Sequence, residues 1–116
     1  MTVSLENSSP ARLASNAVRL SRARRAAILK ALADPRRLQL LERIARAASP
    51  LGCAEARTAL AVSPATLSHH IKELESAGLV HVEREGKFIH LSLRPEVWSA
   101  LVASLASLGQ SRSATP

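Results

Sequence analysis

The sequence has a single cysteine, Cys53, among 116 residues. One thiol cannot form a disulfide within the chain, which is typical of a protein of the reducing cytoplasm. No run of about 18 apolar residues occurs, so we expect no membrane-spanning helix. Residues 1–16 contain an acid, two asparagines and a proline where a signal peptide has an apolar stretch. We therefore expect a cytoplasmic protein without a membrane partner.

The residue patterns of enzymes are also missing. No Ser, Asp or Cys stands at a spacing that would orient a histidine as a general base. No glycine-rich cofactor loop is present either. We predict that the protein is not an enzyme, requires no cofactor and does not depend on a bound metal.

Acidic residues are scarce in the first half of the chain. Between Arg12 and Arg46 there are ten Lys or Arg but only two carboxylates, Asp34 and Glu42. This asymmetry favours an anionic partner, with nucleic acid ahead of a membrane surface. At this length the chain forms one domain at most, and a second subunit would help to complete its core.

Start and stop signals divide the chain into helices and one hairpin. Ser9-Pro10, Asp34-Pro35 and Ser63-Pro64 each resemble an N-cap followed by proline at the first turn. Together with the apolar spacing they predict helices over residues 9–33, 34–48, 53–61 and 63–78, a β-hairpin over 79–93 and a last helix over 95–108. We expect an arm at 1–9, one domain at 10–108 and a flexible tail at 109–116.

Apolar residues at helical spacing indicate which face of each helix is buried. In the second helix they are Leu38, Leu41, Ile44 and Ala45, and in the third Ala56, Ala59 and Leu60. In the fourth helix Leu67, Ile71 and Leu74 form the inner face, and Gly78 ends the helix. His70 lies at the margin of this face, whereas His69 points away from it.

The fourth helix carries the strongest functional signal. Adjacent histidines diverge by 100° and chelate one ion poorly, because helical metal pairs use positions i and i+4. The outward face is instead small, polar and weakly basic, and the helix follows another across a tight turn. This arrangement is typical of a helix that enters the major groove of DNA. The alternative is an ordinary amphipathic helix with a solvated face.

Ten residues are expected to contact DNA. Small side chains allow close approach, hydroxyl and imidazole groups reach base edges or phosphates, and cations contact phosphates. They are Ser63, Ala65, Thr66, Ser68, His69 and Lys72 on the fourth helix, Arg84 and Lys87 beside the hairpin turn, and Arg36 and Arg37 at the start of the second helix.

The hairpin offers a candidate metal site. If Arg84 pairs with Lys87, Val82 faces Ile89 and Val80 faces Leu91 in one apolar layer. That register places His81 opposite His90, with Glu83 nearby, and two imidazoles with a carboxylate can bind zinc or nickel. The alternative is a solvated strand face.

Cys53 is a second candidate for sensing a signal. It follows Gly52 at a helix start, where unpaired N–H groups favour a thiolate, and Arg57 lies one turn further on. A thiol there could be oxidised and could tilt the neighbouring helix. The alternative is a buried cysteine that acts as a small apolar residue.

Two linked motifs carry a family resemblance. "LKALADPRRLQLLERI" and "SPATLSHHIKELESAGLVHVEREGKFIHLSL" resemble the ArsR-type winged helix-turn-helix transcriptional regulators over about residues 27–95. The resemblance implies a homodimeric repressor on a near-palindromic operator in double-stranded DNA, released by an inducing signal. It also implies that the first and last helices form the subunit interface, with Leu13, Leu20, Trp98, Leu101 and Leu105 as its candidate residues.

The chain departs from the best-known inducer sites of that family. "LGCAEA" contains Cys53 alone where metal-binding members have Cys-x-Cys, and "PEVWSALVASLASL" offers only Glu96. Three alternatives to the leading function remain open. They are a basic nucleoid or RNA-binding protein without sequence readout, a metal-responsive repressor that uses the hairpin histidines, and a module that binds another protein.

Overall fold

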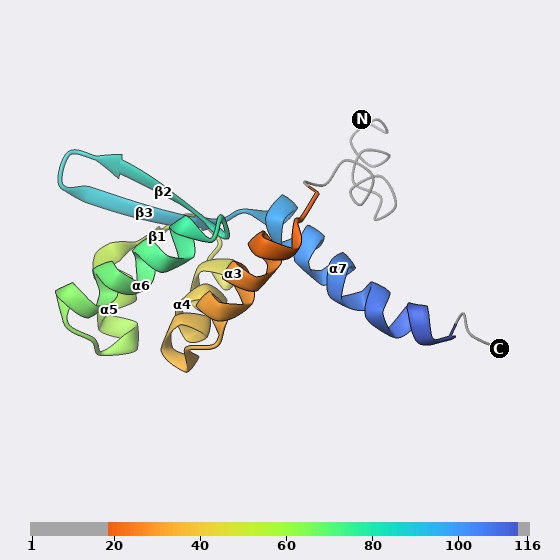
Figure 1. The fold of residues 1–116 in the computed structure, drawn as a ribbon. Helices are drawn as coiled ribbons and strands as arrows, with labels where there is room; N and C mark the ends of the chain where they lie inside the picture. Colours follow the sequence, from red (N-terminus) through yellow and green to blue (C-terminus); the bar gives the residue numbers. More distant parts are fainter. Residues whose placement is uncertain (1–18, 114–116) are drawn as a thin grey trace, which may run out of the picture. The chain divides into compact units, whose positions relative to one another are not determined.

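The computed structural model describes residues 19–113 as five helices and a three-stranded sheet (Figure 1). In chain order the elements are α3 (Arg22–Leu32), α4 (Pro35–Arg46), β1 (Leu51–Gly52), α5 (Cys53–Leu60), α6 (Pro64–Ser76), β2 (Val80–Glu85), β3 (Phe88–Leu93) and α7 (Pro95–Ser113). Residues 23–94 form one compact unit, and α7 belongs to another. Within 19–113 no helix combines the length and hydropathy needed to cross a membrane. The predicted fold class, mainly helical with a β-hairpin, is confirmed.

Local capping determines where α4 and α6 begin. The Asp34 carboxylate accepts hydrogen bonds from the backbone N–H groups of Arg36 (2.9 Å) and Arg37 (3.3 Å), and Pro35 occupies the first turn. Ser63 caps α6 in the same way, with Pro64 after it. These contacts satisfy N–H groups that have no partner within the helix. Both starts agree with the sequence prediction.

The end of α6 is a Schellman motif. Gly78 has a left-handed φ of 84°, its N–H donates to the Glu75 carbonyl at 3.0 Å, and the N–H of Leu79 donates to the Leu74 carbonyl at 3.1 Å. Glycine adopts this conformation without the steric cost of a Cβ. The chain therefore turns sharply from the helix into β2, as the sequence predicted.

Two helix boundaries differ from those expected by more than two residues. The first helix was predicted from Ser9 and Pro10, but residues 19–21 are not helical and α3 begins at Arg22. Ser9, Pro10 and the rest of that predicted start lie outside the described residues. At the other end, α7 continues through Gly109 to Ser113 instead of ending at residue 108. A single glycine in a helix costs only about 1 kcal/mol, so it need not end one.

The buried face of α4 is rotated from the predicted stripe. Leu40, Leu41 and Ile44 are buried together with Arg37, whereas Leu38 is 38% exposed and Ala45 is exposed. The hydropathy pattern predicted Arg37 to lie on the surface, but its guanidinium makes hydrogen bonds inside the fold. In α5, Ala56 and Leu60 are buried as predicted, but Ala59 is exposed.

The sheet is antiparallel in the order β1-β3-β2, and the predicted hairpin register is wrong. Val80 pairs with Leu93, Val82 with Leu91, and Arg84 with Ile89. The shift is two residues, so each side chain stays on its predicted face. The turn consists of Gly86 and Lys87, and Gly86 has a φ of 61°. Glycine at the first position of a two-residue turn is what a type II′ turn uses.

One strand was not predicted at all. Leu51 and Gly52 form β1, which pairs with Leu91 and His90 of β3. Two residues are too few to show an alternating pattern, so only the tertiary contact reveals this strand.

The core of the 23–94 unit comes from every helix and both long strands. Its most deeply buried large side chains are Ile28, Leu40, Leu67, Leu74, Leu79 and Leu91. Figure 1 shows α5 and α6 beside the β2–β3 hairpin, with α4 next to them. This core holds α6 from behind and leaves its opposite face open.

Candidate nucleic-acid interface

The connection between α5 and α6 is tight. Helix α5 ends at Leu60, Ala61 adopts a left-handed φ of 53°, and Ser63 already caps α6. The Arg36 guanidinium of α4 donates to the Leu60 carbonyl at the end of α5. A left-handed alanine costs about 1–2 kcal/mol, so the surrounding packing must hold the turn in place. The result is a helix-turn-helix with a fixed geometry.

The two faces of α6 separate as predicted. Leu67 and Leu74 are 1% and 0% exposed, and Ile71 is buried between them. Five of the predicted contact residues on this helix are exposed on the other face: Ala65, Thr66, Ser68, His69 and Lys72. The inner side chains thus fix the helix to the core, and the outer ones can meet a duplex.

The N-terminus of α6 suits an anion. Its first turn contains no acidic residue, so the positive end of the helix dipole is not neutralised. The Ser63 hydroxyl is committed to the cap, where it accepts from the Thr66 N–H at 3.1 Å. A phosphate near this end would meet both the dipole and the exposed side chains.

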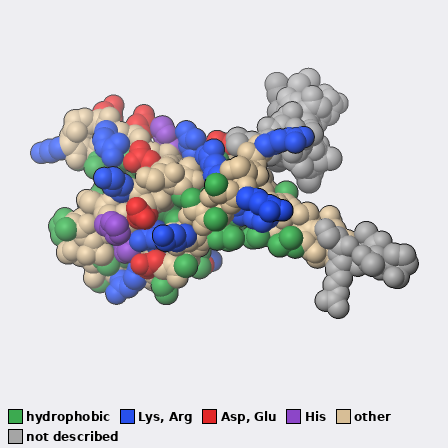
Figure 2. All heavy atoms as spheres, in the orientation of Figure 1, with side chains coloured by type: hydrophobic (Ala, Val, Ile, Leu, Met, Phe, Trp, Pro, Cys, Tyr) green, Lys and Arg blue, Asp and Glu red, His purple; other side chains and the backbone are tan. Residues whose placement is uncertain are grey.

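The hairpin cations are only partly available. Lys87 is exposed in the turn. The Arg84 guanidinium lies 3.8 Å from the Glu75 carboxylate of α6, with both side chains solvent-exposed. Such an exposed pair is weak, so a phosphate can compete for Arg84. In Figure 2, Lys and Arg side chains on the visible face alternate with acidic ones and do not form a single patch.

Arg36 and Arg37, both predicted to contact DNA, have different environments. Arg36 is exposed, although its guanidinium holds the end of α5. Arg37 is only 8% exposed, and its guanidinium faces the interior. It donates to the Ala31 carbonyl at 3.2 Å and to His70 Nδ1 at 3.4 Å, and it lies 3.8 Å from the Asp34 carboxylate. The expectation for Arg37 is wrong, because its donors are used inside the fold.

His70 is buried rather than marginal, with 5% of its surface exposed. Burial is the main cause that lowers the pKa of His70 below its usual value, while the Asp34 carboxylate opposes this effect. The pKa of Asp34 is itself lowered, first by the hydrogen bond from the Arg37 backbone. No sequence pattern pointed to the contact between Arg37 and His70, because arginine is mostly exposed in proteins and the two residues are 33 positions apart.

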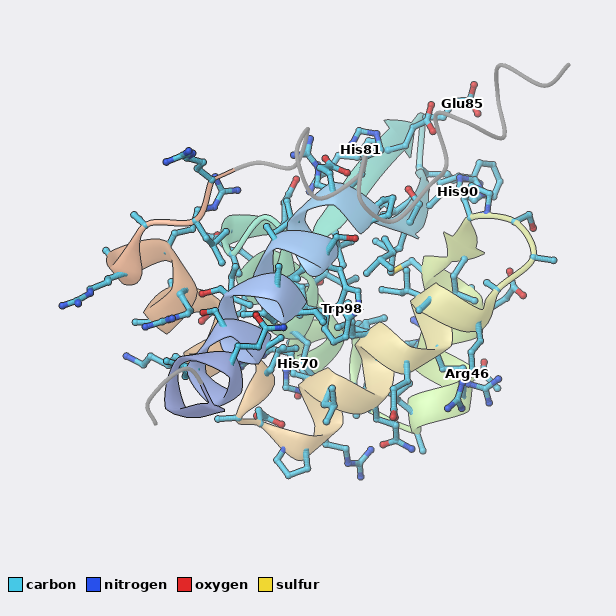
Figure 3. All side chains as sticks on the ribbon, turned by 90° about the vertical axis from the view of Figure 1, so that its right-hand side faces the viewer. Arg46, His70, His81, Glu85, His90 and Trp98 are labelled. Carbon is cyan, nitrogen blue, oxygen red and sulfur yellow. The ribbon has the colours of Figure 1, made fainter. Side chains whose placement is uncertain are left out.

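The pairing of His81 with His90, on which the predicted metal site in the hairpin depended, is absent from the hairpin. His90 pairs with Glu83, and His81 pairs with Ser92 instead of His90. Among residues 19–113, no three His, Cys, Asp or Glu side chains are grouped so that they could hold a metal ion. Figure 3 shows His81 and His90 on the sheet, apart from His70.

Cys53 is the first residue of α5 and is partly exposed. It lines a cavity of about 350 Å³ with Ser68 and Lys72 of α6 and with Arg84 and Ile89 of the hairpin. A second cavity of about 180 Å³ contains Cys53, Arg57 and Lys87. The thiol therefore lies where α5, α6 and the hairpin meet.

The candidate dimer-interface residues of α7 differ in their exposure to solvent. Trp98 and Leu105 are each 37% exposed, whereas Leu101 is buried. Val102 and Leu108 are also exposed, at 46% and 60%, and extend the Trp98–Leu105 stripe at helical spacing. Val102 was missed, although its position four residues after Trp98 could have indicated it. Leu20 is half-buried ahead of α3, and Leu13 lies outside the described residues.

Comparisons with known proteins agree with this geometry. A family model described as "Helix-turn-helix domain" matches residues 20–83. An HTH-type transcriptional regulator of Bacillus subtilis (strain 168), YceK, is 31% identical over 74 residues, which are 64% of this chain and 74% of that protein. The family match therefore includes both helices of the motif and the first four residues of β2.

Solved structures share the fold. An ArsR-like transcriptional regulator from Rhodococcus sp. RHA1 superimposes with a TM-score of 0.69 at 24% identity, over 78% of this chain and 84% of that one. The homodimeric winged helix-turn-helix DNA-binding domain Mb0332 from Mycobacterium bovis, described as a possible ArsR-family regulator, has a TM-score of 0.60 at 30% identity. That match covers 78% of this chain and 84% of the other.

Proposed function

Since the chain belongs to the helix-turn-helix transcriptional regulators and has the ArsR-type winged fold, we propose that it is a homodimeric repressor of a near-palindromic operator. One observation carries the proposal: Thr66, Ser68 and His69 are exposed on the face of α6 opposite its buried leucines. These side chains are short enough to let the helix enter a major groove and polar enough to read base edges. Lys72, Lys87, Arg84 and Arg36 supply cations for phosphates around that face.

The exposed stripe on α7 supports the dimer. Trp98, Val102, Leu105 and Leu108 present apolar side chains to solvent, and a solvent-exposed stripe of this kind is typical of an interaction surface. The homodimeric state of the Mycobacterium bovis domain favours a second copy of this chain as the partner. A symmetric dimer would contact two half-sites separated by about one helical turn, or about 10 base pairs.

The inducing signal we propose is oxidation of Cys53. A peroxide would transfer one oxygen atom to the thiol, giving a sulfenic acid and water. The added oxygen would enlarge the side chain between α5, α6 and the hairpin, where Ser68 and Lys72 line the same cavity. We expect mild peroxide to weaken operator binding and a thiol reductant to restore it. An unchanged response in a Cys53→Ser variant would refute this signal.

The experiment that tests the function starts with selection of duplexes from a random pool by the full-length protein. The selected duplex should bind at least about a thousandfold more tightly than random duplex at the same salt concentration. Thr66→Ala and His69→Ala should each reduce that preference, by about 1–3 kcal/mol for a base contact. Thr58→Ala is the matched control, because Thr58 is an exposed threonine on α5 whose hydroxyl bonds within its own helix.

The outcomes distinguish the alternatives. Equal affinity for selected and random duplexes, with strong dependence on salt, would indicate a nucleoid or RNA-binding protein without sequence readout. No duplex binding at any salt concentration would indicate a protein-binding module. A preference that appears only with added zinc or nickel would indicate a metal-responsive regulator.

A further inference from the structure

His69 and His70 are neighbours on the recognition helix α6 but have opposite environments. His69 is exposed toward the proposed DNA, whereas His70 is 5% exposed and lies among the helices (Figure 3). The His70 ring accepts at Nδ1 a hydrogen bond from Arg37 Nε of α4, at 3.4 Å. This is a polar connection between the recognition helix and the helix behind it.

The other groups of Arg37 extend the connection. Its Nη1 donates to the Ala31 carbonyl at the end of α3, and its Nη2 lies 3.8 Å from the Asp34 carboxylate that caps α4. Arg37 is therefore held by two elements before it reaches His70. A side chain fixed in this way constrains its partner on α6 to one position.

The hydrogen bond requires a neutral histidine. An arginine Nε is always a donor, so His70 Nδ1 must present a lone pair, with the ring proton on Nε2. A second proton, on Nδ1, would make the ring nitrogen a donor that faces the Arg37 Nε–H donor. It would also place a positively charged ring beside the positively charged guanidinium. The bond therefore cannot survive protonation of His70.

Charged groups near the His70 ring have opposing effects on its protonation. Asp34 at the start of α4 favours the protonated ring, whereas Arg36 and Arg37 of α4 and His69 of α6 disfavour it. Burial is the largest effect, and the net result is a lowered pKa for His70. Because the folded pKa lies below the unfolded value, the contribution of this contact is complete at neutral pH and is lost as the pH falls below about 6.5.

We propose that His70 is a positioning residue for the recognition helix and that its protonation in mild acid releases α6 from Arg37, so that the operator is bound tightly at neutral pH and weakly in acid. The inference rests on the proposed function, because it concerns the regulation of the same helix. Uptake of one proton limits the effect to at most about a tenfold loss of affinity per pH unit.

The first arm of the test measures operator affinity from pH 7.5 to 5.5 at constant salt. His70→Asn is the informative variant, because its amide oxygen can accept from Arg37 in place of Nδ1 but does not titrate. We expect the wild-type affinity to fall severalfold over this range and the His70→Asn profile to be nearly flat. His69→Asn is the matched control, and it should keep the loss in acid.

The second arm needs no DNA, and its main measurement uses the wild-type protein alone. NMR titration of the free wild-type protein should show the His70 ring and the backbone amides of Thr66 and Ser68 shifting together. Arg37→Gln should move the His70 transition to higher pH, since it removes the guanidinium. Independent titration of the ring and the α6 amides would overturn the proposal.

The two hypotheses can fail separately. Specific duplex binding with identical pH profiles for wild type and His70→Asn would overturn the switch and leave the regulator function intact. Coupled NMR titration in a protein that binds no specific duplex would support the release of α6 on protonation of His70, but it would refute the regulator function and the control of operator affinity.

Discussion

Ser63 and Thr66 are joined by two hydrogen bonds at the start of α6: the Thr66 backbone N–H donates to Ser63 Oγ, and Ser63 Oγ donates to Thr66 Oγ1 at 2.9 Å. The cap of the recognition helix therefore also orients the first hydroxyl that would meet a base. Because Thr66 Oγ1 accepts from Ser63, its own proton remains free to donate outward. Helix stability and the proposed DNA contact of Thr66 thus both depend on Ser63.

Replacing Ser63 should affect both properties. Ser63→Ala removes the cap and should lower the free energy of unfolding by about 1 kcal/mol. It should also weaken specific binding, because Thr66 loses its orientation. Urea denaturation and operator titration measure the two effects. Ser68→Ala is the matched control for stability: Ser68 is exposed on the same helix, and its side chain makes no hydrogen bond to another described residue, so the free energy of unfolding should change by less than about 0.5 kcal/mol.

The need for glycine at position 78, at the end of α6, should come from its backbone conformation and not from the nearby Arg24 side chain. A Cβ on Gly78 would overlap the Arg24 guanidinium, but that group ends a flexible side chain and can move. The left-handed φ of 84° cannot be relieved in this way. We expect Gly78→Ala to destabilise the protein by about 1–2 kcal/mol.

A double substitution separates the two causes. Gly78→Ala should cost the same in an Arg24→Ala background, and a smaller cost there would show that the contact, not φ, is responsible. Gly109→Ala is the contrasting control, because Gly109 lies inside α7 with open space around it. That change should stabilise the chain by about 0.5–1 kcal/mol. Thermal and urea unfolding of the four variants would measure these differences.

The exposed stripe of α7 should determine the oligomeric state. Leu105→Asp places a charge in the proposed interface and should raise the dimer dissociation constant at least about tenfold, since burying a leucine is worth more than the roughly 1.4 kcal/mol that tenfold requires. Sedimentation across a concentration series measures the constant. Ala103→Asp, exposed on another side of the helix, should leave it unchanged. Equal effects of both substitutions would argue against this stripe as the interface.

The Asp34 cap should make the free energy of unfolding depend on pH, at lower pH values than the His70 contact does. Hydrogen bonds from the backbone of Arg37 and Arg36 help lower the pKa of Asp34 below 3.8 in the folded chain. Its contribution is therefore present above pH 3.8 and lost as the pH falls through the folded value. Asp34→Asn keeps a good N-cap but cannot titrate. In a His70→Asn background, which removes the histidine that Asp34 influences, Asp34→Asn should change stability by a constant amount above pH 5 and by a different amount toward pH 2.5, as measured by urea midpoints.

Capping residues and the spacing of apolar residues were sufficient to predict much of the fold. The Asp34-Pro35 and Ser63-Pro64 pairs predicted the starts of α4 and α6, and Gly78 predicted the end of α6, because a cap forms among residues adjacent in sequence. The outward direction of Thr66, Ser68 and His69 was also predictable, since the helical period relates it directly to Leu67, Ile71 and Leu74. The faces of the hairpin followed from the alternation of its residues in the same way.

The predictions that failed depended either on the exact position of the hairpin turn or on contacts with residues distant in sequence. The alternation of Val80, Val82 and Arg84 is unchanged by a two-residue shift, so only the turn at Gly86-Lys87 selects the register, and with it the separation of His81 from His90. β1 exists only because β3 lies beside it.

The sequence by itself determined the helix-turn-helix, its caps and the polar surface of the recognition helix, because all three depend on neighbours within one or two turns. Only the tertiary structure decided that Arg37 and His70 are interior partners instead of surface groups. The physical reason is that a charged or titratable side chain can be buried only where donors and acceptors from other elements satisfy it, and residues 33 positions apart meet only when the chain has folded.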